Sequence, residues 1–184
     1  LRERVSVKGN KINGYVVNME KAFENIVRYY ANRAALELGL MHKGQATTIL
    51  AVHEYNSGLN YHVIPDDLIL YKDKKLILDA KYKLISNNIE NQKKPHRDDI
   101  YQMISSCLAY NTWEAILVYP EYRQELKHNW DIIQTVNGKR LKITARSINI
   151  NISDLELVEA IKAIIKNTNF YSEVTNETEL SISV

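Results

Sequence analysis

The sequence predicts an α/β fold in which a mixed β-sheet is flanked by helices. A strongly periodic apolar stripe indicates an opening helix from about Asn18 to Leu38. Strand-like apolar segments follow between residues 47 and 83. A further apolar strand, Ala115–Tyr119, returns after a helix expected at about Arg97–Tyr110. Because a strand that returns after a helix usually pairs in parallel, the sheet should contain both strand directions.

The opening helix is supported by side chains that recur every three or four residues. Gly39 follows directly and is expected to end the helix. The apolar face comprises Met19, Ala22, Phe23, Ile26, Val27, Tyr30, Ala34 and Leu38.

The next part of the chain contains three candidate strands, which we expect to form a three-strand meander. They are Thr47–Tyr55, Tyr61–Tyr71 and Lys75–Lys83. The first two are joined by Asn56-Ser57-Gly58, and the last two by a lysine-rich turn.

The C-terminal third predicts a hairpin and a closing helix. His128–Val136 and Arg140–Ile148 flank Asn137-Gly138, which is a strong signal for a tight hairpin turn. Ser153 and Glu156 have the spacing of a capping box ahead of an amphipathic helix. The apolar face of that helix comprises Leu157, Ala160, Ile161, Ile164 and Ile165.

Length and composition indicate one globular domain over residues 1–184. The chain is 45% hydrophobic and 25% charged. We expect a core at about 17–120, the extra hairpin and closing helix at 121–168, and a polar, loose tail at 169–184. Because position 1 is leucine, the chain is expected to be a piece of a longer subunit.

The cellular setting is predicted to be the cytoplasm. Cys107 is the only cysteine, which excludes an internal disulfide and any four-cysteine metal cage. A reducing compartment fits this composition. No apolar run approaches the roughly 20 residues that span a bilayer, so no membrane association is expected.

The strongest functional signal is a pair of acids on two neighbouring strands. If the hairpin turns between Lys72 and Asp73, residues whose numbers sum to 145 face each other, which places Asp66 opposite Asp79. Opposed side chains lie about 5 Å apart at Cβ, so these carboxylates would repel unless a divalent cation neutralised them. Lys81 lies two residues after Asp79 and should share its face. This arrangement predicts a metal-dependent nuclease site.

A simpler interpretation is an ion pair at the end of a strand, between Asp79 and Lys81. An acid followed two residues later by lysine also occurs at Asp73 to Lys75 and at Glu125 to Lys127. The tripeptide of an acid, any residue and lysine therefore does not indicate a nuclease site by itself. The Asp79 copy differs because buried aliphatic residues precede it, and a carboxylate in an interior strand must be paired, hydrogen-bonded or bound to metal.

The charge distribution favours a phosphodiester substrate, although the net charge is only +2. Between residues 72 and 97 there are eight basic side chains and three acidic ones. A positive rim around an acidic metal centre suits nucleic acid, whereas a solvated lysine-rich loop is the alternative interpretation. The candidate DNA contacts are Lys83, Lys93, Lys94 and Arg97.

The order of these motifs resembles the PD-(D/E)xK nuclease superfamily, whose core is the restriction-endonuclease-like α/β fold. More narrowly, residues 17–120 resemble the nuclease domain of McrC-type subunits of McrBC modification-dependent restriction systems. The segments that carry the resemblance are Met19-Glu20-Lys21-Ala22-Phe23-Glu24, Pro65-Asp66, Leu78-Asp79-Ala80-Lys81-Tyr82-Lys83, Asp99-Ile100-Tyr101-Gln102-Met103 and Val118-Tyr119-Pro120.

The resemblance implies roles for particular residues. Asp66, Asp79 and the backbone carbonyl of Ala80 would hold Mg²⁺ or Mn²⁺. Lys81 would orient or help deprotonate the attacking water and stabilise charge on the phosphate. Glu24 would approach from the first helix, either bonding a metal-bound water or binding metal directly.

Two helix residues carry further expectations. Glu20, one turn before Glu24, competes for the role of the helix acid. Gln102 would steady Lys81 or a phosphate from the second helix. Related nucleases often have a tyrosine four residues after this glutamine, but Ser106 stands there in this chain, so only Gln102 is transferred.

The resemblance also implies an overall function. The chain would be the Mg²⁺-dependent endonuclease subunit of a 5-methylcytosine-dependent restriction system, cutting double-stranded DNA with a McrB-like AAA+ GTPase subunit. Two alternatives remain at this point. One is a repair or recombination nuclease of the same superfamily, and the other is a non-catalytic DNA-binding module with a nuclease-like fold.

Overall fold

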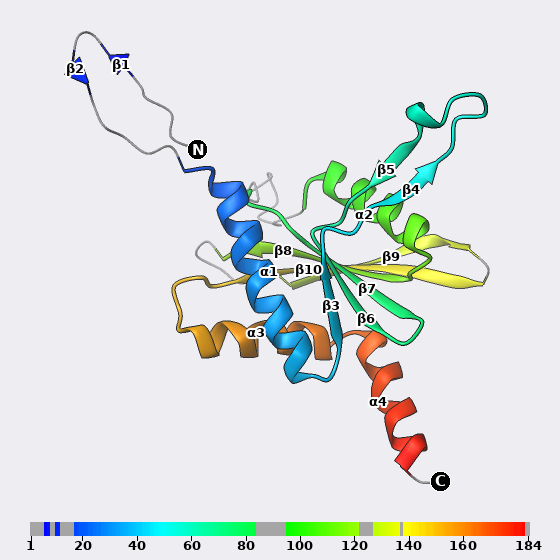
Figure 1. Ribbon diagram of the computed structural model, residues 1–184. Coiled ribbons are helices and arrows are strands. Elements are labelled where there is room, and N and C mark those ends of the chain that lie inside the picture. The colour runs from blue at the N-terminus through cyan, green and yellow to red at the C-terminus, as the bar shows by residue number, and fades with distance from the viewer. Residues whose placement is uncertain are drawn as a thin grey trace.

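The computed structural model describes residues 6–7, 10–11, 17–83, 95–121, 127–136 and 138–182. Its elements form a central sheet with helices on both faces, a smaller two-stranded sheet and an N-terminal strand pair (Figure 1). The helices are α1 (Met19–Glu37), the 3-10 helix η1 (Ser57–Leu59), α2 (Arg97–Tyr110), α3 (Asp154–Lys166) and α4 (Asn169–Ile182). The strands are β1 (Ser6–Val7), β2 (Asn10–Lys11), β3 (Met41–Gly44), β4 (Thr48–Ala51), β5 (Tyr61–Val63), β6 (Asp67–Tyr71), β7 (Lys74–Ala80), β8 (Glu114–Pro120), β9 (Lys127–Val136) and β10 (Lys139–Ile148).

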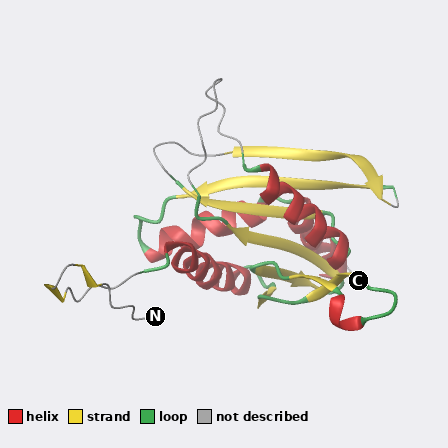
Figure 2. Cartoon of the chain, turned by 90° about the horizontal axis from the view of Figure 1, so that it is seen from above, coloured by secondary structure: helices red, strands yellow, loops and turns green. Residues whose placement is uncertain are grey.

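The central sheet is mixed, and its six strands are ordered β3-β6-β7-β8-β10-β9. β8 pairs in parallel with β7 on one side and with β10 on the other, which confirms the predicted parallel strand. The remaining pairs are antiparallel. β9 is the edge strand beside β10, and these two long strands lie at one side of the sheet in Figure 2. The predicted fold class is therefore confirmed.

Two apolar layers enclose the sheet, because strand side chains alternate between its faces. On β7, Leu76 and Leu78 pack with α1 and α3, whereas Ile77 packs with α2. Helix α1 contributes Phe23 and Val27 to the first layer, and α3 and α4 complete it. No helix in the described parts of the chain is both long enough and apolar enough to cross a membrane.

The predicted meander is wrong at its first strand. The segment β4 does not enter the central sheet but pairs with β5 in a separate two-stranded sheet. The edge position is taken by β3, which pairs antiparallel with β6. The expected strand over residues 61–71 is divided into β5 and β6 around Pro65, because proline lacks the N–H that a ladder requires.

The predicted loose tail is also wrong, because residues 169–182 form α4. Phe170 and Val174 lie one helical turn apart and are both buried against the first apolar layer. The backbone N–H of Phe170 donates to Glu114 Oε2 of β8 at 3.0 Å, which satisfies a donor at the start of α4. The partners that hold this tail are therefore distant in sequence.

The other local predictions agree closely with the structure. Helix α1 ends at Glu37, and Gly39, which was predicted to end it, has φ +70°. Asn18 caps the start of α1 by accepting from the Lys21 N–H at 3.0 Å, although it was not predicted as a cap. The capping box between Ser153 and Glu156 is present at the start of α3. β9 and β10 form the predicted hairpin, in which Gly138 has φ +73°. The other predicted turn residue, Asn137, lies outside the described residues.

Candidate active site

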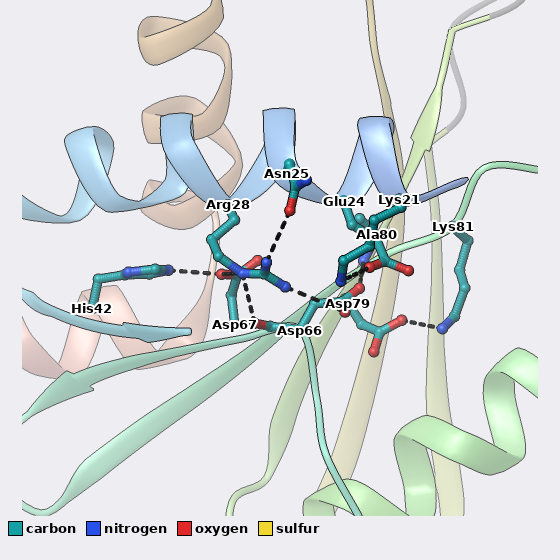
Figure 3. A network of polar contacts seen from close by, with 10 residues as sticks. All are labelled: Lys21, Glu24, Asn25, Arg28, His42, Asp66, Asp67, Asp79, Ala80 and Lys81. Atoms are coloured by element: carbon teal, nitrogen blue, oxygen red, sulfur yellow. Dashed lines mark hydrogen bonds and ion pairs between the residues drawn. The ribbon is translucent and has the colours of Figure 1, made fainter. Parts of the chain in front are cut away.

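The register of the β6–β7 hairpin brings Asp66 and Asp79 to the same end of two neighbouring strands. Asp67 pairs with Leu78, as the predicted sum of 145 requires, and Lys72 adopts a positive φ of 54° in the turn. Asp66 lies immediately before β6, and its carboxylate Oδ2 accepts the backbone N–H of Ala80 at 3.0 Å (Figure 3). This hydrogen bond fixes the Asp66 side chain beside the end of β7.

Both acids are buried, and Lys81 lies beside them. Asp66 is 8% exposed and Asp79 is 1% exposed. Lys81 Nζ forms an ion pair with Asp79 Oδ1, and the Lys81 side chain is 12% exposed. The backbone N–H of Lys81 donates to the Val118 carbonyl of β8 at 2.8 Å, which extends the contact with the neighbouring strand. Two acids and one lysine therefore lie close together at the C-terminal end of β7.

Burial and mutual repulsion control the charge of this group. Burial is the main cause that raises the pKa of Asp66 to about 7, and the charge of Asp79 is the second cause. Burial also raises the pKa of Asp79, although Lys81 opposes that shift. Burial acts to lower the pKa of Lys81, but the adjacent Asp79 outweighs it and the net shift is upward. The site thus favours a cation beside the acid pair.

Of the two glutamates proposed as the helix acid, Glu24 lies nearer to the acid pair. Its charge contributes to the raised pKa of Asp66, and its side chain is 18% exposed. Glu24 Oε2 accepts from Lys21 Nζ at 2.8 Å. Glu20 is exposed. The geometry therefore favours Glu24 as the helix carboxylate that faces this site.

A buried ionic network behind Asp66 was missed by sequence reasoning (Figure 3). Asp67 is fully buried, and its Oδ1 lies 2.8 Å from His42 Nε2 and 3.5 Å from Arg28 Nε. Arg28 also approaches Asp66, with its Nη2 atom 3.7 Å from Asp66 Oδ1. Since Gly44 has no side chain, the Arg28 side chain can lie against it; a Cβ there would sit 3.0 Å from Arg28 Cδ.

Asp99 is a second residue whose position was missed. It lies in the first turn of α2 and is 2% exposed. Its Oδ1 accepts from Lys83 Nζ at 2.5 Å and its Oδ2 from the Tyr119 hydroxyl at 3.0 Å. The signal was present in the sequence, because Asp99 is one turn before Met103 and shares its buried face.

The remaining predicted residues are less closely associated with the acids. Gln102 is exposed, and within the described residues no hydrogen bond links it to Lys81. The Arg97 guanidinium lies over the Tyr101 ring, with its Cζ atom 5.9 Å from the ring centroid. Two candidate DNA contacts, Lys93 and Lys94, fall outside the described residues.

The donor set suits a hard cation that retains several waters. Within the described ranges, no three His, Cys, Asp or Glu side chains gather closely enough to hold a metal by themselves. Two carboxylates are available, Asp66 and Asp79, and burial raises the pKa of both. Oxygen donors with waters completing the shell are typical of Mg²⁺ sites.

The mixed sheet with helices on both faces is consistent with a restriction-endonuclease-like fold, and the buried acid pair with lysine lies at the ends of its central strands. One family model, described as McrBC 5-methylcytosine restriction system component, matches residues 3–120, which is more than half of the chain. The chain belongs to this family, and the predicted kinship with McrBC systems is confirmed. No curated protein matches the chain.

Family membership makes the chain a component of a 5-methylcytosine restriction system. It also implies that the chain works with a partner in a restriction complex. The described geometry allows a more specific role to be proposed.

Proposed function

We propose that this chain is the Mg²⁺-dependent DNA endonuclease subunit of its restriction system, with a PD-(D/E)xK site. The observation that carries the proposal is the buried Asp66–Asp79 pair with Lys81 on the same strand end. Two repelling carboxylates in a nearly water-free place destabilise the protein, so their presence is best explained by a bound cation. The family match supports the setting of the reaction.

In the proposed reaction, Asp66, Asp79 and the carbonyl of Ala80 would hold Mg²⁺ or Mn²⁺. The ion, when bound, acidifies water and neutralises charge on the phosphate. Lys81 is positioned by its ion pair with Asp79 to orient the attacking water and to donate to a phosphate oxygen. In-line attack breaks the bond between phosphorus and the 3′ oxygen, which leaves 5′-phosphate and 3′-hydroxyl ends. Glu24 is proposed to accept a hydrogen bond from a water at this site.

The proposed partners are double-stranded DNA and an AAA+ GTPase subunit of McrB type. Recognition of 5-methylcytosine is proposed to lie on the partner. Cleavage is therefore expected to require both subunits.

The first test is Mn²⁺ binding by calorimetry, because it does not need the partner. Asp66→Ala and Asp79→Ala should each abolish binding, whereas Asp73→Ala should bind like the wild type. Asp73 is a matched control, because it belongs to the other Asp-x-Lys copy of the same hairpin but is exposed in the turn. Equal weak binding in all four proteins would mean that the acids are structural.

The second test adds the GTPase subunit and methylated closed circular DNA. Asp79→Ala should stop cutting while the far-ultraviolet circular dichroism spectrum is retained, and Asp73→Ala should cut normally. Cleavage by the Asp79→Ala protein at the wild-type rate would overturn the site assignment. Metal binding without cleavage of any DNA would favour a non-catalytic DNA-binding module.

A further inference from the structure

The pair formed by Lys83 and Asp99 has the geometry of an anchored cation. The carboxylate of Asp99 is 2% exposed, whereas the Lys83 side chain is 37% exposed, and the two join at 2.5 Å. The ammonium has three N–H donors, so one bond to Asp99 leaves two. The Tyr119 hydroxyl binds the other oxygen of Asp99 at 3.0 Å and fixes the carboxylate from the β8 side. The Lys83 ammonium is thus held by a buried carboxylate, while the Lys83 side chain remains partly exposed.

This anchored lysine lies next to the candidate active site. Tyr119, whose hydroxyl binds Asp99, directly follows Val118, and the Val118 carbonyl accepts the Lys81 N–H at 2.8 Å. Lys83 follows Lys81 by two residues, and a backbone hydrogen bond of 3.0 Å runs from the Lys83 N–H to the Lys81 carbonyl. The segment that carries the candidate catalytic lysine therefore also carries the anchored one.

Stabilisation of α2 alone does not account for this arrangement. Asp98 is also in the first turn of α2 and is exposed, so it can interact with the helix dipole without loss of hydration. Burying the Asp99 carboxylate costs free energy, and a salt bridge of this kind is weak evidence for stability. A buried acid that orients a half-exposed lysine beside a phosphodiester site has a more specific use.

We infer that Asp99 is a positioning residue that holds Lys83 for contact with a DNA phosphate adjacent to the bond being cut. This inference rests on the proposed nuclease function and deepens it. Lys83 supplies the phosphate contact. Because Asp99 already restricts the conformation of the Lys83 side chain, less conformational entropy is lost when DNA binds. The Tyr119 hydroxyl orients Asp99 by donating to its Oδ2.

DNA binding without cleavage tests the inference. Fluorescence anisotropy of a labelled duplex is measured in metal-free buffer at several salt concentrations. Asp99→Asn is compared with Asp98→Asn, since both remove one negative charge from the same helical turn, and only the first releases Lys83. We expect Asp99→Asn to bind DNA about two- to tenfold more weakly than Asp98→Asn. Equal affinities would overturn the positioning role.

A second variant separates the phosphate contact from folding. The double variant with Lys83→Gln and Asp99→Asn removes both charges, so no unpaired charge is left in the interior. Losing one phosphate contact should reduce the slope of log K against log salt concentration by about 0.9 relative to the wild type. A purely structural pair would leave this slope unchanged, which would refute the inference even if the single variants were unstable.

The two proposals fail in different ways. Failure of the proposed metal site at Asp66 and Asp79 would be seen in Mn²⁺ calorimetry. In the same experiment, the Asp99→Asn protein should still bind Mn²⁺. The anchored lysine is tested by DNA affinity and salt slope without metal. Retained Mn²⁺ binding with an unchanged salt slope would therefore reject only the role of Lys83 and Asp99.

Discussion

Replacing Asp66 with asparagine should make the metal-free protein more stable at neutral pH, although it removes a proposed catalytic group. Burial and the charge of Asp79 raise the pKa of Asp66 from 3.8 to about 7. The folded protein therefore holds a proton that the unfolded chain releases over this pH range. Asparagine cannot ionise, and its side-chain oxygen can still accept the Ala80 N–H that bonds Asp66 at 3.0 Å.

The expected magnitude follows from this shift. Below about pH 4 both states are protonated at Asp66, and there is no penalty. From about pH 4 to pH 7 each unit lowers the free energy of unfolding by about 1.4 kcal/mol. The total loss is about 4 kcal/mol for a shift of about three units, and it persists above pH 7. This is a large fraction of the 5 to 15 kcal/mol that typically stabilises a domain.

The assay is urea unfolding in the presence of a chelator, from pH 4.5 to pH 8. The wild type should lose stability as the pH rises, and Asp66→Asn should lose much less; their difference also includes relief of the repulsion on Asp79. Asp73→Asn, in the exposed turn, should follow the wild type. Saturating Mn²⁺ should restore the stability of the wild type at pH 8 but not change the Asp66→Asn protein. Parallel pH profiles for the wild type and Asp66→Asn would refute the reasoning.

Three further outcomes are expected. Gly44→Ala should destabilise the protein by about 1 to 3 kcal/mol in urea titrations, because its Cβ would lie 3.0 Å from Arg28 Cδ, and the anchored guanidinium cannot easily move. Phe170→Ala should cost about 3 to 5 kcal/mol, because Phe170 is 5% exposed in the core, whereas Leu155→Ala at a 71% exposed position should change stability by less than about 0.5 kcal/mol. Burial raises the pKa of the Cys107 thiol to about 12, so a thiol-reactive probe at pH 8 should label it only after unfolding.

The parts of the fold that could be predicted from the sequence are those whose signals are local. Helix α1 is defined by its apolar stripe and by Gly39 after its end, and α3 by its capping box. The hairpin register required only the position of the turn, since opposed residues then have a constant sum. The placement of Asp66 beside Asp79 followed from that register alone.

The parts that were missed depend on partners far away in the sequence. The strand β3 is only four residues long and carries no alternating apolar pattern, yet its pairing with β6 brings His42 to Asp67. The helix α4 needs the acceptor on Glu114, which lies 56 residues before Phe170. The division of β5 from β6 has a local signal in Pro65, but residues 61–71 were predicted as one strand.

The charges around the site explain why Asp66 is the acid most sensitive to a cation. Five of the described carboxylates lie in or around the site, and four of them have a lysine or arginine atom within 3.5 Å. Asp66 is the exception, because the nearest cationic atom is on Arg28 at 3.7 Å and Arg28 is shared with Asp67. A divalent ion placed beside Asp66 would therefore supply the charge that the described side chains leave uncompensated, and its binding should be coupled to the same proton that sets the pH dependence of stability. The paired acids are Glu24 with Lys21, Asp67 with Arg28, Asp79 with Lys81, and Asp99 with Lys83.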